Sequence, residues 1–275
     1  MSFTTADVVK LRKVTGAGMM DCKNALAEAD GNFDRALEII REKGKLVANK
    51  RADREAAEGV VLAKTTADGK LGAMVVLNCE TDFVAKNKDF VAFAESILDL
   101  GLKNKAQNLD ELKTFKLDGH TVEVQVTEQT GVIGEKIELS YYKTIEAETV
   151  VSYIHPGNKL ATLVGFNKAD LESQVAKDVA MQVAAMAPIA IDKDSVPKEV
   201  VEKELEIAKE KYRQEGKPEA ILDKIAQGSL NKFFQESTLL NQTYVKDGKI
   251  SIRDFLAQND KELEVTAFDR YTLNA

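Results

Sequence analysis

A strand, a tight turn and a second strand occur twice in this sequence, and a helical pattern follows each time. The first copy starts at Gly59 and has its turn at Gly69-Lys70-Leu71. In the second copy, which starts at Thr149, Asn158-Lys159-Leu160 stands about 89 positions further along. Few residues are identical between the copies, but the order of the elements is the same. The repeat predicts an internal duplication, and therefore an α+β fold in which two similar subdomains surround a shared core.

The first 54 residues lack this alternation and show the spacing of three short helices. Gly16-Ala17-Gly18 allows a sharp turn after the first helix, and Asp21 and Asn32 can cap the second and the third. Gly44 stands where a C-terminal cap of the third helix is expected. The sequence that follows, up to Glu58, is rich in Ala, Lys and Arg and predicts a helical linker.

Residues 197–235 carry another pattern, in which apolar residues fall four, three and four positions apart. Such a narrow stripe is typical of helices in coiled coils. Glu215-Gly216-Lys217-Pro218 interrupts it, so we expect two helices in a projecting hairpin. Strand-like sequence returns at Glu264, which places this insertion, at about 190–236, inside the second subdomain. The predicted units are a three-helix domain with its linker (1–54), a first core subdomain (55–147) and a second core subdomain (148–275).

The composition argues against a membrane protein and against a nucleic-acid-binding protein. No stretch approaches the ~18 consecutive apolar residues of a membrane helix, and the N-terminus has no signal-peptide pattern, so we expect a cytoplasmic protein. The net charge is −7 and there is no Trp, which makes the chain a poor ligand for a phosphate backbone. Residues 1–54 hold 11 Lys or Arg against 8 Asp or Glu. This basic start suits an acidic patch on a protein partner or an ordinary solvated surface.

The sequence holds no recognisable catalytic or metal-binding constellation. His120 and His155 lack metal-ligand spacing, both with each other and with Cys22 and Cys79. No glycine-rich phosphate loop and no nucleophile motif occurs. We therefore expect no enzyme activity, no metal and no cofactor. The two cysteines are expected to be reduced and partly buried rather than joined in a disulfide.

Two segments place apolar residues where a core is not guaranteed. Phe83 lies between a strand and a helix, in the segment from Asn78 to Asn87. A phenylalanine there either folds into the protein's own core or enters a partner's pocket, and the position by itself favours the core. Met19 and Met20 lie in the predicted turn between the first two helices. They either form an adaptable contact surface or fill the small core.

Three segments resemble signatures of one known family, in the same order and at the same spacing. The segment Thr15-Gly16-Ala17-Gly18-Met19-Met20-Asp21-Cys22-Lys23 is similar to the N-terminal signature of the elongation factor Ts family. The segment Cys79-Glu80-Thr81-Asp82-Phe83-Val84-Ala85-Lys86 resembles its second signature, and Ile133-Gly134-Glu135-Lys136-Ile137 resembles a third. The resemblance covers essentially the whole chain. It implies a guanine-nucleotide exchange factor that binds elongation factor Tu, in its GDP-bound and nucleotide-free states, during translation elongation.

The resemblance also implies which residues meet the partner. In this family, the segment that matches Thr81, Asp82, Phe83 and Val84 is the one implicated in displacing the partner's Mg²⁺ ion. Displacement of the ion promotes GDP release, so that GTP can bind.

The family's N-terminal domain is ubiquitin-associated-like and docks on the partner's GTPase domain. This implies partner contacts from Met19, Met20 and Lys23. His155, in the loop of the second β-hairpin, corresponds to a histidine at the partner interface. An exposed loop histidine without such a role fits the sequence equally well.

Several structural points are open at this stage. Residues 121–126 alternate like a strand, whereas the family implies a helix nearby, so 118–134 has no assignment. Family members form different assemblies, and a homodimer through the helical hairpin is one alternative. Some members carry an extra C-terminal helical module, and this sequence predicts none.

Two rival functions are also open. The first is an adaptor that binds a ubiquitin-like modifier or a nascent chain, which the three-helix domain alone would allow; failure to co-purify with a GTPase would favour it. The second is an enzyme with its site in a cleft between the two core subdomains. A ligand-sized pocket there, with a perturbed acid or base, would favour it.

Overall fold

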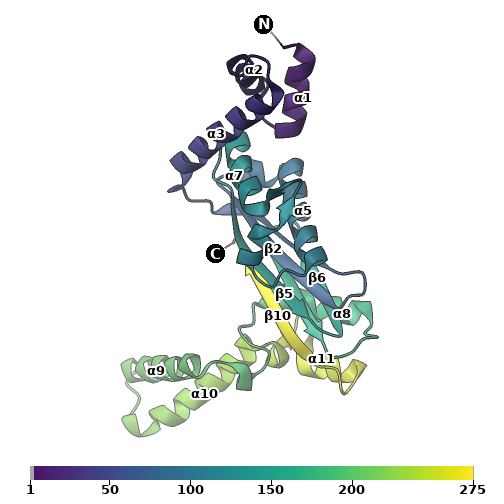
Figure 1. Cartoon of the computed structure of the whole chain (residues 1–275). Coiled ribbons are helices and arrows are strands. Elements are labelled where there is room, and N and C mark those ends of the chain that lie inside the picture. Colours follow the sequence, from purple (N-terminus) through teal and green to yellow (C-terminus); the bar gives the residue numbers. More distant parts are fainter. Residues whose placement is uncertain (1–2, 275) are drawn as a thin grey trace.

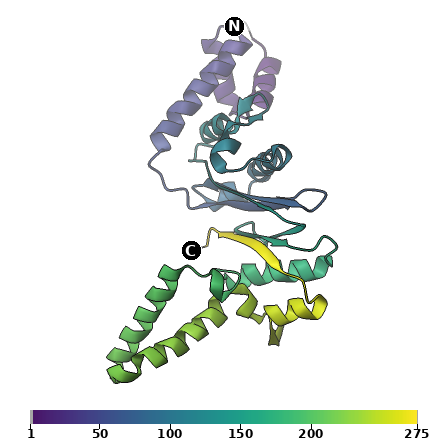
Figure 2. The same cartoon turned by 60° about the horizontal axis from the view of Figure 1, so that its bottom comes forward.

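The computed structural model describes residues 3–274, and the centre of the molecule is built of four layers (Figure 1). Two three-stranded antiparallel sheets pack face to face, and helices cover the outer face of each sheet, as Figure 2 shows. A three-helix unit lies at one end of this body, and a helical hairpin projects from the other end. The α+β class predicted from the sequence is confirmed. The predicted boundaries of the units stay predictions.

The three-helix unit has short turns between its helices. Asn32 caps the third helix as predicted, because its side chain accepts a hydrogen bond from the backbone N–H of Arg35. The prediction that Asp21 caps the second helix is wrong: that helix begins two residues earlier, and Asp21 lies within its first turn. The helices are α1 (Thr5–Thr15), α2 (Met19–Glu28) and α3 (Phe33–Arg51).

Gly44 does not end α3, contrary to the prediction, and the helix continues to Arg51, through the first half of the predicted linker. Gly44 instead faces Gly131 of α7 (Val122–Ile133). The two backbones approach so closely that a β-carbon at Gly131 would lie 2.3 Å from the Cα atom of Gly44. The glycines therefore permit close helix packing, and the three-helix unit docks on the core through α3 and α7.

The first sheet has the order β1-β2-β5. β1 (Glu58–Thr65) and β2 (Leu71–Cys79) form the predicted β-hairpin, and β5 (Glu138–Glu146) pairs with the other edge of β2. The elements between β2 and β5, besides α7, are α4 (Asp82–Ala85), α5 (Lys88–Asn104), α6 (Leu109–Thr114), β3 (Lys116–Leu117) and β4 (His120–Thr121).

The unassigned segment 118–134 contains β4, which pairs with β3, and the whole of α7. Thr121 caps α7, and Val122 and Val126 are buried on one face of it. These valines are four positions apart, which is the helical spacing. The alternation of residues 121–126 therefore does not indicate a strand, because every fourth residue is buried here rather than every second.

The second sheet has the same order as the first, with the return strand of the β-hairpin at its centre. It consists of β6 (Thr149–Ile154), β7 (Leu160–Phe166) and β10 (Val265–Thr272), and α8 (Ser173–Met186) packs on its outer face. The sequence patterns did not reveal three short elements of this half, which are β8 (Thr243–Tyr244), β9 (Asp247–Ser251) and α11 (Ile252–Asn259).

An apolar cluster fills the space between the two sheets. Its buried residues come from both sheets and are Val61, Ala63, Met74, Val76, Ile145, Val150, Ala161 and Leu163. At its margin the hydroxyl of Tyr141 on β5 donates to both carboxylate oxygens of Asp269 on β10, at 2.9 Å each.

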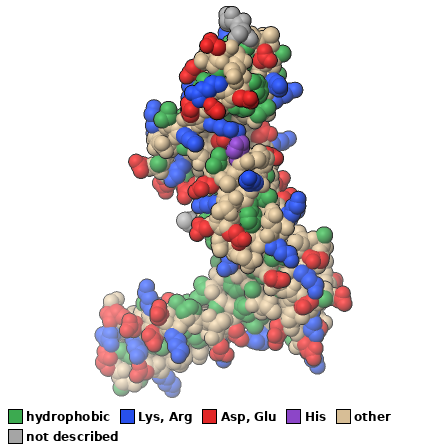
Figure 3. Space-filling view, viewed as in Figure 1, with side chains coloured by type: hydrophobic (Ala, Val, Ile, Leu, Met, Phe, Trp, Pro, Cys, Tyr) green, Lys and Arg blue, Asp and Glu red, His purple; other side chains and the backbone are tan. Residues whose placement is uncertain are grey.

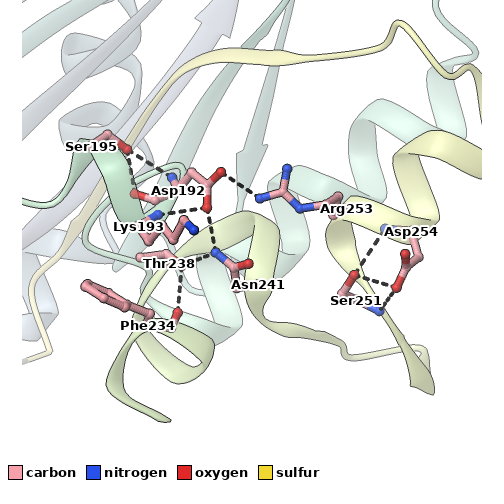
Figure 4. A network of polar contacts seen from close by, with 9 residues as sticks. All are labelled: Asp192, Lys193, Ser195, Phe234, Thr238, Asn241, Ser251, Arg253 and Asp254. Carbon is pink, nitrogen blue, oxygen red and sulfur yellow. Dashed lines mark hydrogen bonds and ion pairs between the residues drawn. The ribbon is translucent and has the colours of Figure 1, made fainter. Parts of the chain in front are cut away.

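The helical hairpin consists of α9 (Lys198–Gln214) and α10 (Glu219–Ser237). Figure 3 shows charged side chains of both signs at its outer end and apolar side chains gathered where it meets the body. Asp192, just before η1 (Lys193–Ser195), holds the base of the hairpin. Its carboxylate accepts hydrogen bonds from Arg253 of α11 at 2.6 Å and from Asn241 of η2 (Leu239–Asn241) at 2.7 Å (Figure 4). These contacts tie both ends of the hairpin to α11.

The state of the cysteines and the character of the helices can be read from residues 3–274. Cys22 and Cys79 are both free, as predicted, and they are fully buried rather than partly buried. None of the described helices combines the length and the apolar character needed to cross a bilayer.

Candidate partner-binding site

Phe83 is the most exposed of the large apolar side chains in the described part of the chain, with 84% of its surface accessible. It lies on α4, a single helical turn that follows β2. Its neighbours Val84 and Ala85 pack against the core of the first half, so Phe83 is the one apolar side chain of α4 that points away from the protein. The expectation that Phe83 folds into the core is wrong, because its neighbours already occupy the inward side of this turn.

The backbone around Phe83 is held by local hydrogen bonds. Thr81 caps α4, and its side chain accepts from the N–H of Val84 at 3.4 Å. The thiol of Cys79 donates to the carbonyl of Thr81 at 3.1 Å. Burial, and then the charge of Glu135, raise the pKa of Cys79 to about 12. The thiol is therefore a neutral structural donor at physiological pH.

Asp82 is already paired in the free chain. Its carboxylate accepts a hydrogen bond from the Lys86 ammonium at 2.6 Å, one helical turn further on. This contact holds the pKa of Asp82 below its usual range. Asp82 therefore stays ionised at neutral pH, and any polar contact with a partner has to compete with Lys86.

The loop that carries His155 lies beside the same end of the first sheet. The N–H of Val61 donates to the carbonyl of Asn158 at 2.7 Å, and Lys159 pairs with Glu58 at 2.8 Å. Glu58 is directly opposite Cys79 in the β-hairpin. The structure thus brings the loop of the second β-hairpin next to the segment that carries Phe83. His155 itself is exposed, with its Nδ1 atom 3.0 Å from the hydroxyl of Tyr153.

Met19, Met20 and Lys23 are exposed residues of α2, in the three-helix unit. The prediction that the methionines lie in a turn is wrong, because α2 begins at Met19. With 38% and 62% of their surfaces accessible, Met19 and Met20 do not fill the core of this unit. Their role in a contact with a partner stays a prediction.

Comparison with known proteins decides the family. The family model described as elongation factor TS matches residues 80–275, which include Thr81 and α4, together the Phe83 segment. The chain belongs to the elongation factor Ts family. Proteins of this family are translation elongation factors, and the chain shares that general role.

Relatives named elongation factor Ts match the chain over its full length. One from Azobacteroides pseudotrichonymphae is 51% identical over 274 residues, which cover 100% of this chain and 99% of the relative. One from Porphyromonas gingivalis is 51% identical over 276 residues, and one from Amoebophilus asiaticus is 50% identical over 277 residues. In both of these pairs 100% of each chain is covered.

The sequence patterns gave no role to three charged residues around the Phe83 segment of this elongation factor Ts chain. Glu80, Glu135 and Arg51 join the segment to the ends of α7 and α3 by hydrogen bonds and an ion pair. Their partners are 29 to 56 positions away in the sequence. Glu80 and Glu135 each lie in a segment that resembles a family signature, but such a resemblance does not indicate a contact between the two segments.

One cavity of about 610 Å³ lies between the three-helix unit and the first half of the core. Its lining includes His120 and the ion pair of Arg41 with Glu128 (3.0 Å). Within residues 3–274, no group of three or more His, Cys, Asp or Glu side chains is arranged to hold a metal ion.

Proposed function

We propose that this chain is a guanine-nucleotide exchange factor that binds elongation factor Tu, displaces Mg²⁺ and promotes GDP release so that GTP can bind. The exposed Phe83 carries the proposal: a large apolar ring stands on a short helix whose neighbouring residues are anchored. Burial of such a ring in a partner's pocket is worth roughly 2 kcal/mol. Because the segment is already ordered, little conformational entropy is lost when it binds.

The proposed mechanism needs two effects at the partner's nucleotide site. Phe83 enters an apolar gap beside the elements that hold the metal ion, and Asp82 exchanges Lys86 for polar groups of the partner. Mg²⁺ bridges the phosphate oxygens of the nucleotide, so a shift of its ligands weakens the hold on GDP. The factor and the nucleotide weaken each other by the same free energy, because the coupling between two binding events is reciprocal. Incoming nucleotide can therefore eject the factor.

The proposal assigns the remaining exposed residues to the same partner. Met19, Met20 and Lys23 contact it from the three-helix unit, and His155 contacts it from the loop beside Phe83. The partner is bound in both its GDP-bound and its nucleotide-free state. No bond is made or broken by this chain, so the proposal includes no enzyme activity, and the chain works in the cytoplasm with its partner.

Association of two copies through the helical hairpin stays a prediction of the sequence. The hairpin exposes Ile207 and Ile221, which are available for such a contact. Sedimentation velocity tests it, and a monomer at every concentration would contradict it.

The test of the proposed function is the release of a fluorescent GDP from purified elongation factor Tu. We expect the chain to accelerate release and Phe83→Ala to lose about 10- to 100-fold of that acceleration, as expected for about 1.4–2.8 kcal/mol of lost contact. Val245→Ala is the matched control, because Val245 is also exposed but lies between β8 and β9. It should leave the rate unchanged.

The outcomes separate the hypotheses. If the wild-type chain does not accelerate GDP release from a cognate partner, the proposed function is wrong and the adaptor hypothesis takes its place. If the wild-type accelerates release and folded Phe83→Ala does so equally well, the function stands and the assignment of Phe83 is wrong.

A further inference from the structure

Glu80, just before α4, and Glu135, just after α7, each bind the backbone of the other's segment. The Glu135 carboxylate accepts from the N–H groups of Glu80 (3.1 Å) and Thr81 (3.0 Å), and from the hydroxyl of Thr81 (2.7 Å). The Glu80 carboxylate accepts from the N–H of Lys136 (2.6 Å). Hydrogen bonds to ionised groups are stronger than those between neutral groups. The two segments are thus joined in both directions.

Arg51 balances the charge of Glu80. Its Nη1 atom lies 2.8 and 2.9 Å from the two carboxylate oxygens, and Arg51 is the last residue of α3. The hydrogen bond from the N–H of Lys136, together with the contact from Arg51, holds the pKa of Glu80 below its usual range although partial burial opposes this. Glu80 is therefore ionised at neutral pH, and the ends of α3 and α7 meet at the segment before α4.

Glu135 comes from a firmly anchored part of the fold. Gly134 ends α7 with φ 78°, a left-handed conformation that suits glycine. Ile137 is buried, and its N–H donates to the buried hydroxyl of Thr130 at 3.0 Å. The position of Glu135 is thus fixed from both sides by contacts with the core.

Thr81 connects Glu135 to Phe83. Its hydroxyl has one proton, which it donates to Glu135, so its lone pairs are left to accept from the N–H of Val84. Phe83 lies between Thr81 and Val84 in the chain. Loss of Glu135 would free the Thr81 hydroxyl to rotate, and α4 would lose its fixed cap.

We propose that Glu135 is a positioning residue that holds Phe83 in its outward orientation and affects nucleotide exchange only through Phe83. The effect on exchange rests on the proposed function, whereas the effect on the segment does not. A carboxylate is needed at this position because three donors meet two acceptor oxygens. The amide of glutamine has only one oxygen, and its NH₂ group would face another donor.

The test compares Glu135→Gln with Glu138→Gln in the full chain. Glu138 is an exposed carboxylate three residues after Glu135, and it pairs with the Lys136 ammonium at 3.4 Å. In the chain alone, we expect the amide hydrogens of Thr81 and Val84 to exchange about tenfold faster in Glu135→Gln, as expected for the loss of a charge-assisted hydrogen bond. The amides of the central strand β2 report on global stability and should not change. Glu138→Gln should match the wild type throughout.

The second measurement is GDP release from elongation factor Tu. Glu135→Gln should reduce the stimulated rate about tenfold in the wild-type background and should have no further effect in the Phe83→Ala background. An equal loss in both backgrounds, or unchanged amide exchange at Thr81 and Val84, would overturn the positioning role. If the wild-type chain does not stimulate release at all, the proposed function fails. The amide-exchange measurement needs no partner and still decides whether Glu135 positions the segment.

Discussion

At the scale of single residues, the direction of one side chain decides what the candidate site can do. Phe83 and Val84 are adjacent apolar residues on the same short helix, yet Val84 packs on the core and Phe83 stands in solvent. Hydrophobicity alone predicts burial for both. The orientation of α4, set by Thr81 and by the packing of Ala85, separates their roles.

The thiol of Cys79 carries a prediction at this scale. Its pKa is raised to about 12, mainly by burial, so almost no thiolate is present at pH 8. We expect alkylation of Cys79 in the folded chain to be more than about a hundredfold slower than that of a free thiol, whose pKa is about 8.5. Labelling followed by mass spectrometry measures this, with the urea-unfolded chain as the control. Rapid labelling of Cys79 at pH 8 without unfolding would show that the segment before α4 opens readily.

At the scale of elements, two glycines set how the three-helix unit meets the core. Helices that cross at Gly44 and Gly131 approach more closely than side chains allow. Because α7 also leads directly to Glu135, the same helix supports the three-helix unit and the Phe83 segment.

Gly131→Ala should disturb this crossing. The new β-carbon would lie 2.3 Å from the Gly44 Cα atom, so the helices have to move apart, and we expect a loss of about 1–3 kcal/mol in the free energy of unfolding. The gain in helix propensity, about 1 kcal/mol, offsets part of it. Gly228→Ala in α10 is the control, because apart from its own helix backbone and chain neighbours no atom lies within 4 Å of its β-carbon position. Urea unfolding compares the two variants, and equal stability would contradict the close crossing.

At the scale of the whole molecule, the two sheets form the centre between two extended ends. The apolar cluster joins the sheets, and Tyr141 and Asp269 add a polar contact between β5 and β10. The three-helix unit and the helical hairpin lie at opposite ends of this centre (Figure 1). The three-helix unit packs on α7, and Glu135 just after α7 binds the backbone before α4, so both parts are joined to the core through one helix.

Asp269 makes the joint between the sheets sensitive to pH. Burial raises its pKa, although the Tyr141 hydroxyl opposes this. A carboxyl group whose pKa is higher in the folded state favours folding most below its unfolded pKa of about 3.9, and that contribution is lost as the pH rises through the folded value. Asn resembles the protonated form, so Asp269→Asn should raise the unfolding midpoint at pH 7 by about 2 °C.

The difference between Asp269→Asn and the wild type should shrink as the pH is lowered to 4. Thermal unfolding at both values measures it, with the exposed Asp53→Asn as the control. A lower midpoint for Asp269→Asn at pH 7 would mean that the ionised carboxylate stabilises the joint, contrary to this expectation.

The local sequence determined the elements whose signals lie within one stretch of chain. The two β-hairpins follow from runs of apolar residues around turns at Gly69 and Asn158, both of which adopt positive φ. The helical hairpin follows from its narrow apolar stripe and the break at Glu215–Pro218. Periodicity and turn residues are local properties, so no tertiary information is needed to recognise them.

Only the tertiary structure decided how these elements are used. The outward direction of Phe83, the helix at 122–133 and the contact of Gly44 with Gly131 depend on what each residue packs against. The hydrogen bonds of Glu135 and Glu80 join residues 54 to 56 positions apart. Contacts between distant segments leave no periodic pattern in either segment. The local conformation of each residue is equally favourable whether or not the distant contact forms. The sequence therefore points to the segment that carries the site, and the fold determines the geometry in which that segment is held.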